Sequence, residues 1–181
     1  MNVGAASASI SNTAATAIAA EAAPTWVLTL DHIGFEAAAR LLESLGLQLA
    51  RIADGEAIPG SFWGECEAGL VASTVYARGD TPVHSLLHES AHLLMIPLER
   101  RAAVHTDATD SLAEEDAACY LQILLADGLP GVGRDRLMGD MDAWGYSFRL
   151  GSARAWFEND ADDARRSLRE FAPAVLERFG D

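Results

Sequence analysis

Two histidines and a glutamate within five consecutive residues are the side chains in this sequence best suited to chemistry. His88 and His92 are four residues apart, so on an α-helix they point the same way and can hold one metal ion. Glu89 lies about 100° further around the helix axis than His88, where it can reach a water on that ion without binding the ion itself. Zinc held by neutral imidazoles makes such a water acidic, and the carboxylate can take its proton. The spacing therefore predicts metal-assisted hydrolysis with Glu89 as the base.

The stretch that contains this H-E-x-x-H motif is predicted to be a helix over residues 82–96. Thr81 is a candidate N-cap, Pro82 suits the first helical position, and Pro97 marks the end. Apolar residues recur at helical spacing and would form the core face: Val83, Leu87, Ala91, Leu94 and Leu98. The alternative interpretation is an ordinary amphipathic helix that carries two histidines and a solvated glutamate.

A third histidine, His84, precedes the motif by one helical turn. A straight helix separates His84 from His92 by about 12 Å, which is too far for both to bind one ion. Ser85 follows His84, so only the pair His88 and His92 has a glutamate in the general-base position. We therefore expect His84 to lie at the surface or on the substrate side.

A catalytic zinc ion needs a third protein ligand, and the residues just after the motif do not supply it. The metzincin pattern would place a glycine at position 95 and a histidine at position 98, but Met95 and Leu98 stand there. His105 is the one later histidine, and it precedes a polar stretch that looks like a connecting loop. The third ligand is therefore expected further along the chain.

A second helix is predicted over residues 111–125. Ser111 and Glu114 match a capping box, in which Glu114 reaches back to the N-cap amide. If Glu114 has that structural role, Glu115 becomes the best third ligand. Glu114 and Asp116 remain alternatives, because an error of one residue turns a side chain by about 100°.

This second helix resembles the gluzincins, zinc peptidases whose third ligand is a glutamate on the helix that follows HExxH. The stretch from Glu115 to Leu121, EDAACYL, is similar to the ExxA[N/D]xF line of the ImmA/IrrE-like and other minimal gluzincin domains. Cys119 stands where those families carry Asn or Asp, and 22 residues separate His92 from Glu115. The resemblance covers about half of the chain. It implies a zincin-like fold with Glu115 as the third zinc ligand.

The segments before the motif are predicted to form a small mixed sheet, so the fold class is α+β. Residues 26–30, 47–52 and 69–76 have strand-like composition, and residues 34–45 are predicted to be a helix. Residues 62–66 are expected to form a short strand or a loop over the cleft. In peptidases that resemble this arrangement, the strand before the metal helix is an edge on which an extended substrate lies.

After the second helix, a Gly- and Pro-rich stretch precedes a predicted helix over residues 134–143 and an aromatic run over residues 144–151. Tyr146 and Arg149 in that run are candidates to stabilise the oxyanion of the carbonyl during hydrolysis. Buried packing is the competing role for an aromatic side chain. The tail over residues 161–179 is predicted to be one or two amphipathic helices, interrupted near Pro173.

Composition limits the remaining possibilities. The 181 residues include 27 acidic and 13 basic side chains, and the formal net charge of -14 excludes a nucleic-acid backbone as partner. Residues 1–23 are almost entirely small or polar and predict a flexible extension, which leaves residues 24–181 as a single domain. Two cysteines, no signal-peptide pattern and no apolar run of membrane-spanning length predict a cytoplasmic protein that does not contact membranes.

These observations together predict a zinc-dependent peptidase acting on peptide or protein substrates. His88, His92 and Glu115 would bind Zn²⁺, with Glu89 as base and proton shuttle. One alternative is a regulatory or protein-binding module on a zincin scaffold that does not catalyse a reaction. Another is a domain in which the metal has only a structural role.

Overall fold

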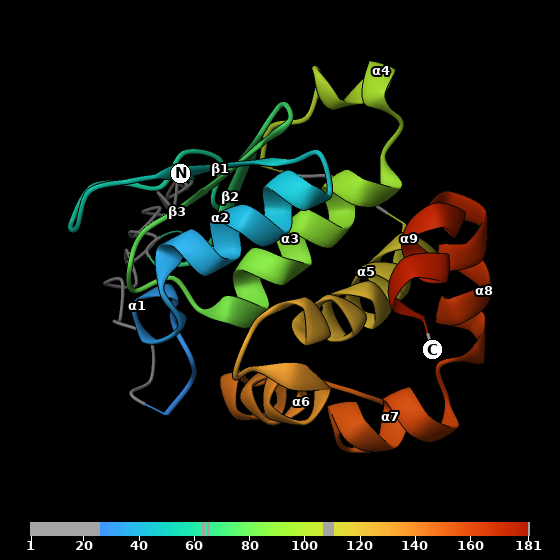
Figure 1. Cartoon of the computed structure of the whole chain (residues 1–181). Coiled ribbons are helices and arrows are strands. Elements are labelled where there is room, and N and C mark those ends of the chain that lie inside the picture. Colours follow the sequence, from blue (N-terminus) through green and yellow to red (C-terminus); the bar gives the residue numbers. More distant parts are fainter. Residues whose placement is uncertain (1–25, 63, 65, 107–110, 181) are drawn as a thin grey trace, which may run out of the picture.

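The computed structural model describes residues 26–62, 64, 66–106 and 111–180 (Figure 1). Within these residues the chain is mixed α+β, with one small sheet and a larger number of helices. The predicted extension over residues 1–23 lies outside the described residues. The elements, in chain order, are α1 (Leu30–Ile33), α2 (Phe35–Ser44), β1 (Gln48–Arg51), β2 (Gly69–Val71), β3 (Thr74–Ala77), α3 (Val83–Met95), α4 (Leu98–Arg101), α5 (Leu112–Leu125), the 3-10 turn η1 (Ala126–Gly128), α6 (Gly133–Trp144), α7 (Ala153–Asn159), α8 (Asp162–Phe171) and α9 (Pro173–Phe179).

The sheet has three strands in the order β1-β3-β2. β1 pairs with β3 in parallel, and β2 pairs with β3 antiparallel, so the predicted mixed sheet is confirmed. The prediction of one continuous strand over residues 69–76 is wrong. Ala72 adopts a left-handed backbone conformation with φ 54 and turns the chain, which makes β2 and β3 a hairpin. β3 is therefore the central strand, and β2 is the edge.

Residues 26–30 do not form the predicted strand. Thr29 makes one isolated antiparallel bridge to Pro82, and the chain then turns into the short helix α1. Backbone bonds to the turn before α3 explain this: the amide of Leu30 bonds to the Thr81 carbonyl at 3.0 Å, and the amide of Asp31 to the Gly79 carbonyl at 2.8 Å. The segment therefore braces the start of α3 instead of extending the sheet.

Helix α3 lies between the sheet and the helices α5 and α6 (Figure 1). It contacts β2 and β3 on one side and α5 on the other, and α5 in turn packs against α8. Apolar side chains of both helices are fully buried in a single core, among them Leu87, Ala91, Leu121 and Leu124. Leu98, expected on the core face, is instead 74% exposed, because α3 ends at Met95 and Leu98 opens the separate helix α4.

The C-terminal third agrees with the predicted helices. α6 covers the helix predicted over residues 134–143, and the tail forms α8 and α9 with Pro173 at the start of the second. α7 was not predicted from the pattern. The part of residues 62–66 that the structure describes is a loop, and Trp63 and Glu65 lie outside the described residues. None of the described helices has the length and apolar character needed to cross a membrane.

Candidate metal centre

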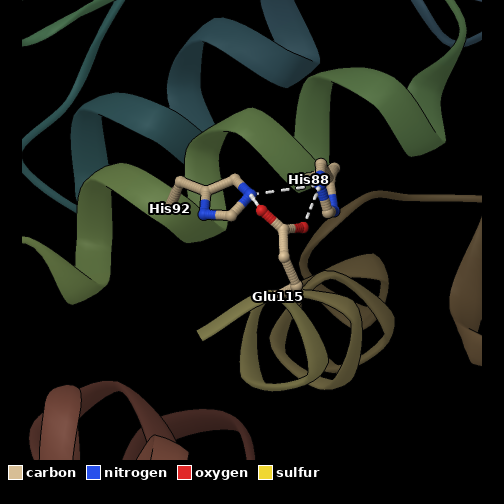
Figure 2. A group of neighbouring side chains, drawn as sticks. All are labelled: His88, His92 and Glu115. Carbon is tan, nitrogen blue, oxygen red and sulfur yellow. Dashed lines mark hydrogen bonds and ion pairs between the residues drawn. The ribbon is translucent and has the colours of Figure 1, made fainter. Parts of the chain in front are cut away.

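His88 and His92 on α3 and Glu115 on α5 point toward one another across the contact between the two helices (Figure 2). Of the residues that the structure describes, these are the His, Cys, Asp or Glu side chains whose ligand atoms gather within 4.8 Å of one another in a group of three. Glu114 is half-buried and Asp116 is exposed, and neither belongs to this group. The structure therefore brings together the three residues predicted to be metal ligands.

The separations between the three ligand groups match those around a tetrahedral zinc ion. Ligands at about 2.0–2.2 Å from such an ion lie about 3.3 Å from each other. The Nε2 atoms of His88 and His92 are 3.1 Å apart. The two carboxylate oxygens of Glu115 lie 3.5 Å from His88 Nε2 and 3.4 Å from His92 Nε2. His88, His92 and Glu115 can thus each offer one ligand atom, all within 4.8 Å of one another, and the side chain of Glu115 is 42% exposed, so solvent can reach the site.

No protein family, curated protein or solved structure matches this chain.

The three ligands form a site that stabilises positive charge. Burial acts to raise the pKa of Glu115, but hydrogen bonds and charge from His88 and His92 outweigh it and hold that pKa far below its ordinary value. Burial acts to lower the pKa of His88, yet Tyr146, Cys119 and Glu115 raise it well above its ordinary value. Protons and a divalent cation would therefore compete for the same ligand atoms.

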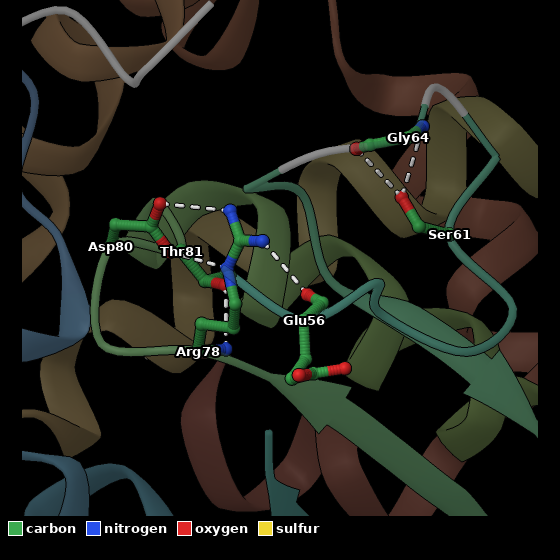
Figure 3. Close-up of polar contacts among 6 residues, drawn as sticks. All are labelled: Glu56, Ser61, Gly64, Arg78, Asp80 and Thr81. Atoms are coloured by element: carbon green, nitrogen blue, oxygen red, sulfur yellow. Dashed lines mark hydrogen bonds and ion pairs between the residues drawn. The ribbon is translucent and has the colours of Figure 1, made fainter. Parts of the chain in front are cut away.

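The start of α3 is fixed by a buried arginine, Arg78, in the turn after β3 (Figure 3). Its guanidinium donates two hydrogen bonds to the Asp80 carboxylate, both at 2.9 Å, and a third to the Glu56 carbonyl at 2.8 Å. The Arg78 amide donates to the Thr81 hydroxyl at 2.9 Å. Because the Thr81 side chain is used there, the N-cap position passes to Pro82, one residue later than predicted. The motif is therefore held two turns from a rigid anchor.

The start of α5 differs from the predicted capping box. Ser111 is the N-cap, but the amides of Glu114 and Glu115 bond to its carbonyl oxygen at 3.0 Å rather than to its hydroxyl. The helix nevertheless begins where expected, so Glu115 lies in its first turn. An acid in this position is also stabilised by the helix dipole, which favours the ionised carboxylate that a metal requires.

Gln122 is a residue of this site that was not found from the sequence. Its Oε1 lies 2.7 Å from Nδ1 of His88, and its side chain is fully buried. When His88 Nδ1 donates to this amide oxygen, the proton is fixed on Nδ1 and the Nε2 lone pair faces Glu115 and His92. The signal was present: Gln122 follows Glu115 by seven residues, two helical turns along the same face of α5. A glutamine in an apolar stretch has no distinctive pattern, which explains the omission.

A group of aromatic side chains continues the site beyond His88. The ring of Tyr146 lies 6.3 Å from that of His88 and 5.4 Å from that of His84, and the His84 ring lies 5.0 Å from Trp144. The expectation that His84 lies at the surface is wrong, because it is 1% exposed. Burial, helped by the charge of His88, lowers the pKa of His84 to about 3, so the ring is neutral. Tyr146 therefore lies beside the ligand His88, and His84 is a neutral, buried ring next to it.

Arg149 and Glu89 are the remaining residues that the sequence predicted for the site. Arg149 pairs with Asp160 through its Nε at 2.6 Å, and its side chain is 76% exposed, so the structure does not bring it to the ligand group. Arg149 lies in the irregular segment between α6 and α7, and its ion pair holds it beside Asp160 at the end of α7. Glu89 is half-buried on α3, one residue after His88, as the helical prediction requires.

Proposed function

We propose that this protein is a zinc-dependent peptidase of the gluzincin type, with His88, His92 and Glu115 as the zinc ligands. The observation that carries the proposal is the convergence of three ligand groups from two helices at separations of 3.1–3.5 Å. A small mixed sheet that packs against the metal helix also supports the proposal of a zincin-like fold.

Each side chain around the ligands has a separate task in this proposal. Zinc, when bound, supplies a positive centre that acidifies a water molecule and polarises a carbonyl group. Glu89 accepts the proton of the attacking water and returns it to the leaving amine. Gln122 keeps His88 in the tautomer that presents Nε2. Both protein roles are assigned to residues that the structure describes.

Tyr146 is the residue proposed to donate a hydrogen bond to the oxyanion. Burial raises its pKa to about 12, although the charge of His88 opposes this, so the phenol keeps its proton at neutral pH and can donate it. Arg149 has no part in the proposed site, because its guanidinium is held by Asp160 at the surface.

The test of the proposal is cleavage of a peptide library by the zinc-loaded protein. We expect Glu89→Gln to lower turnover about 10²- to 10⁴-fold while zinc content is unchanged, because the base is lost and the ligands are kept. Glu99→Gln, in the exposed helix α4, removes the same charge and should leave turnover unchanged. Full zinc content without cleavage of any peptide would contradict a peptidase and favour the non-catalytic module.

A further inference from the structure

The outer edge of β2 is already paired with other segments of this chain. The amide of Leu70 bonds to the Gly60 carbonyl at 3.2 Å, and the Leu70 carbonyl accepts from the Thr106 amide at 3.0 Å. The amide of Ala72 bonds to the Val104 carbonyl at 2.9 Å. The strand that leads into the metal helix, β3, is in turn the central strand of the sheet. The expectation that this strand is an open edge for an extended substrate is therefore wrong.

One half of the β2 edge is covered by a tightly packed segment, residues 58–61. Ile58 is buried, and a Cβ on Gly60 would lie 2.1 Å from the Leu70 carbonyl oxygen. The next residue, Ser61, closes a small loop, in which its hydroxyl donates to the Gly64 carbonyl at 2.9 Å and accepts from the Gly64 amide at 3.1 Å (Figure 3). This half of the cover is thus a fixed part of the fold.

The other half of the edge is covered by residues 104–106, named the strap. Two backbone hydrogen bonds between described residues, those of Val104 and Thr106, join the strap to β2, and His105 faces Val71 in an antiparallel bridge. All three side chains of the strap are half-buried or exposed. An extended peptide that adds to a sheet edge forms main-chain bonds of the same kind. The strap therefore occupies β2 in the way that a bound peptide would.

The strap is also strained where it ends. Thr106 adopts a left-handed backbone conformation with φ 68. This conformation is unfavourable for a β-branched residue, and it disfavours the closed strap by about tenfold in a local equilibrium. A segment that is held by few backbone bonds, without a fully buried side chain, lies at the low end of local stability. The strap should therefore open more readily than residues 58–61.

The strap belongs to the connection between the two helices that carry the metal ligands. At its start, the buried Arg101 donates through Nε to the Ile96 carbonyl at 3.0 Å, which fastens α4 to the end of α3. β2 itself packs against α3, the helix of His88 and His92. Opening of the strap would thus free backbone groups of β2 beside the metal helix, while Arg101 keeps the connection in place.

We propose that the strap is an autoinhibitory segment, which occupies the β2 edge until an extended peptide substrate displaces it. The proposal rests on the proposed function and adds a mode of regulation to it. When the strap leaves, the Leu70 carbonyl and the Ala72 amide become available, and the substrate backbone bonds to them in the antiparallel direction that the strap had. The fraction of protein with an open strap then limits the fraction that takes substrate.

Two substitutions of Thr106 shift the strap in opposite directions. Thr106→Gly relieves the left-handed strain and should hold the strap closed, whereas Thr106→Pro removes the amide that bonds to Leu70 and fixes φ near -65°. Both variants remove the hydroxyl that lies 2.7 Å from His105 Nδ1, so this contact cannot explain a difference between them.

Hydrogen exchange at the Ala72 amide, measured by NMR on the full chain, reports strap opening without requiring turnover. We expect exchange about threefold slower in Thr106→Gly and at least tenfold faster in Thr106→Pro, with no change at the Leu70 amide. Ala103→Gly, in the exposed turn before the strap, is the control and should not slow exchange. Equal exchange at Ala72 in the wild type and Thr106→Gly would overturn the inference, even if Thr106→Pro failed to fold.

Peptide cleavage separates this inference from the proposed function. With the zinc-loaded proteins and the peptide library, kcat/KM should rise several-fold in Thr106→Pro and fall about threefold in Thr106→Gly. Equal values in the wild type and both variants would overturn autoinhibition but leave the peptidase standing. Absence of cleavage in all three would overturn the peptidase and the regulation of it, whereas exchange at Ala72 would still decide whether the strap opens.

Discussion

The two sides of the metal centre are held by different forces. Between α3 and α5, the ligands project from a packed apolar contact in which Leu87 and Leu121 are fully buried. Along β2, Leu70 is also fully buried, and backbone hydrogen bonds join the strand to the segments around Gly60 and Val104. Hydrophobic burial supplies most folding free energy, and single hydrogen bonds supply about 1 kcal/mol each. We therefore expect the ligand side to contribute more of the folding free energy than the hydrogen bonds along β2.

The largest expected effect is on the ligand side, from Leu121→Ala. Removal of a fully buried leucine side chain should lower the free energy of unfolding by about 3 kcal/mol, measured by urea denaturation of the metal-free protein. Leu112→Ala is the matched control, because Leu112 is on the same helix and 76% exposed. Its change should stay within about 0.5 kcal/mol, and equal losses for the two variants would contradict a core between α3 and α5.

Gln122→Met should weaken zinc binding about 10- to 100-fold, because His88 loses the acceptor that fixes its tautomer. Competition with a fluorescent chelator gives the affinity. Gln122→Glu keeps an acceptor and should restore most of it, whereas Gln48→Met on β1 should have no effect. Unchanged affinity in Gln122→Met would show that the buried amide only fills space.

His84→Phe tests the burial of His84 against Trp144 and Tyr146. The pKa of His84 is held at about 3 in the folded protein, mainly by burial, against an ordinary 6.5 in the unfolded chain. Between these values the unfolded chain binds more protons, so stability falls as the pH is lowered. From pH 7.5 to pH 5 this residue should cost about 2 kcal/mol. That loss should be absent in His84→Phe, measured by denaturation in a chelator, and an identical pH dependence would contradict a buried neutral ring.

The smallest effect concerns the β2 side, where Gly60→Ala is compared with Gly55→Ala. Both glycines have positive φ, 71 and 79, so both variants pay about 1 kcal/mol for a left-handed alanine. Only at Gly60 would the new methyl also meet the Leu70 carbonyl, whereas nothing lies within 4 Å at Gly55. We expect about 1 kcal/mol of additional destabilisation at Gly60, with faster hydrogen exchange at the Leu70 amide. Equal effects would indicate that the edge is not tightly covered.

The sequence predicted the ligand side well because its signals are local. His88 and His92 need only helical spacing, and Ser111 marks the start of the next helix. The choice of Glu115 over Glu114 and Asp116 came from a predicted capping box, which the structure does not match, and from the resemblance to gluzincins. Both helices were predicted to within a residue or two because Pro97 and the polar stretch before α5 interrupt the pattern. Local rules of spacing and capping are sufficient for such features.

The β2 side and the surroundings of His84 could not be predicted, because their contacts are distant along the chain. Ala72 reverses the strand without a glycine or asparagine to mark the turn, and the partners of Leu70 come from Gly60 and Thr106. His84 was expected at the surface or on the substrate side, and its burial could not be seen because it depends on Trp144 and Tyr146, some 60 residues later. Residue type alone does not indicate such contacts, which follow from how α6 packs beside α3.

The measurement that most directly tests the account is zinc content, by inductively coupled plasma mass spectrometry, of the wild-type protein beside Glu115→Ala, Glu114→Ala and Asp116→Ala. The account predicts one zinc ion per chain in the wild type, the same in Glu114→Ala and Asp116→Ala, and loss of zinc in Glu115→Ala. Wild-type protein that binds no zinc, or full zinc content in Glu115→Ala, would contradict a metal centre formed by His88, His92 and Glu115.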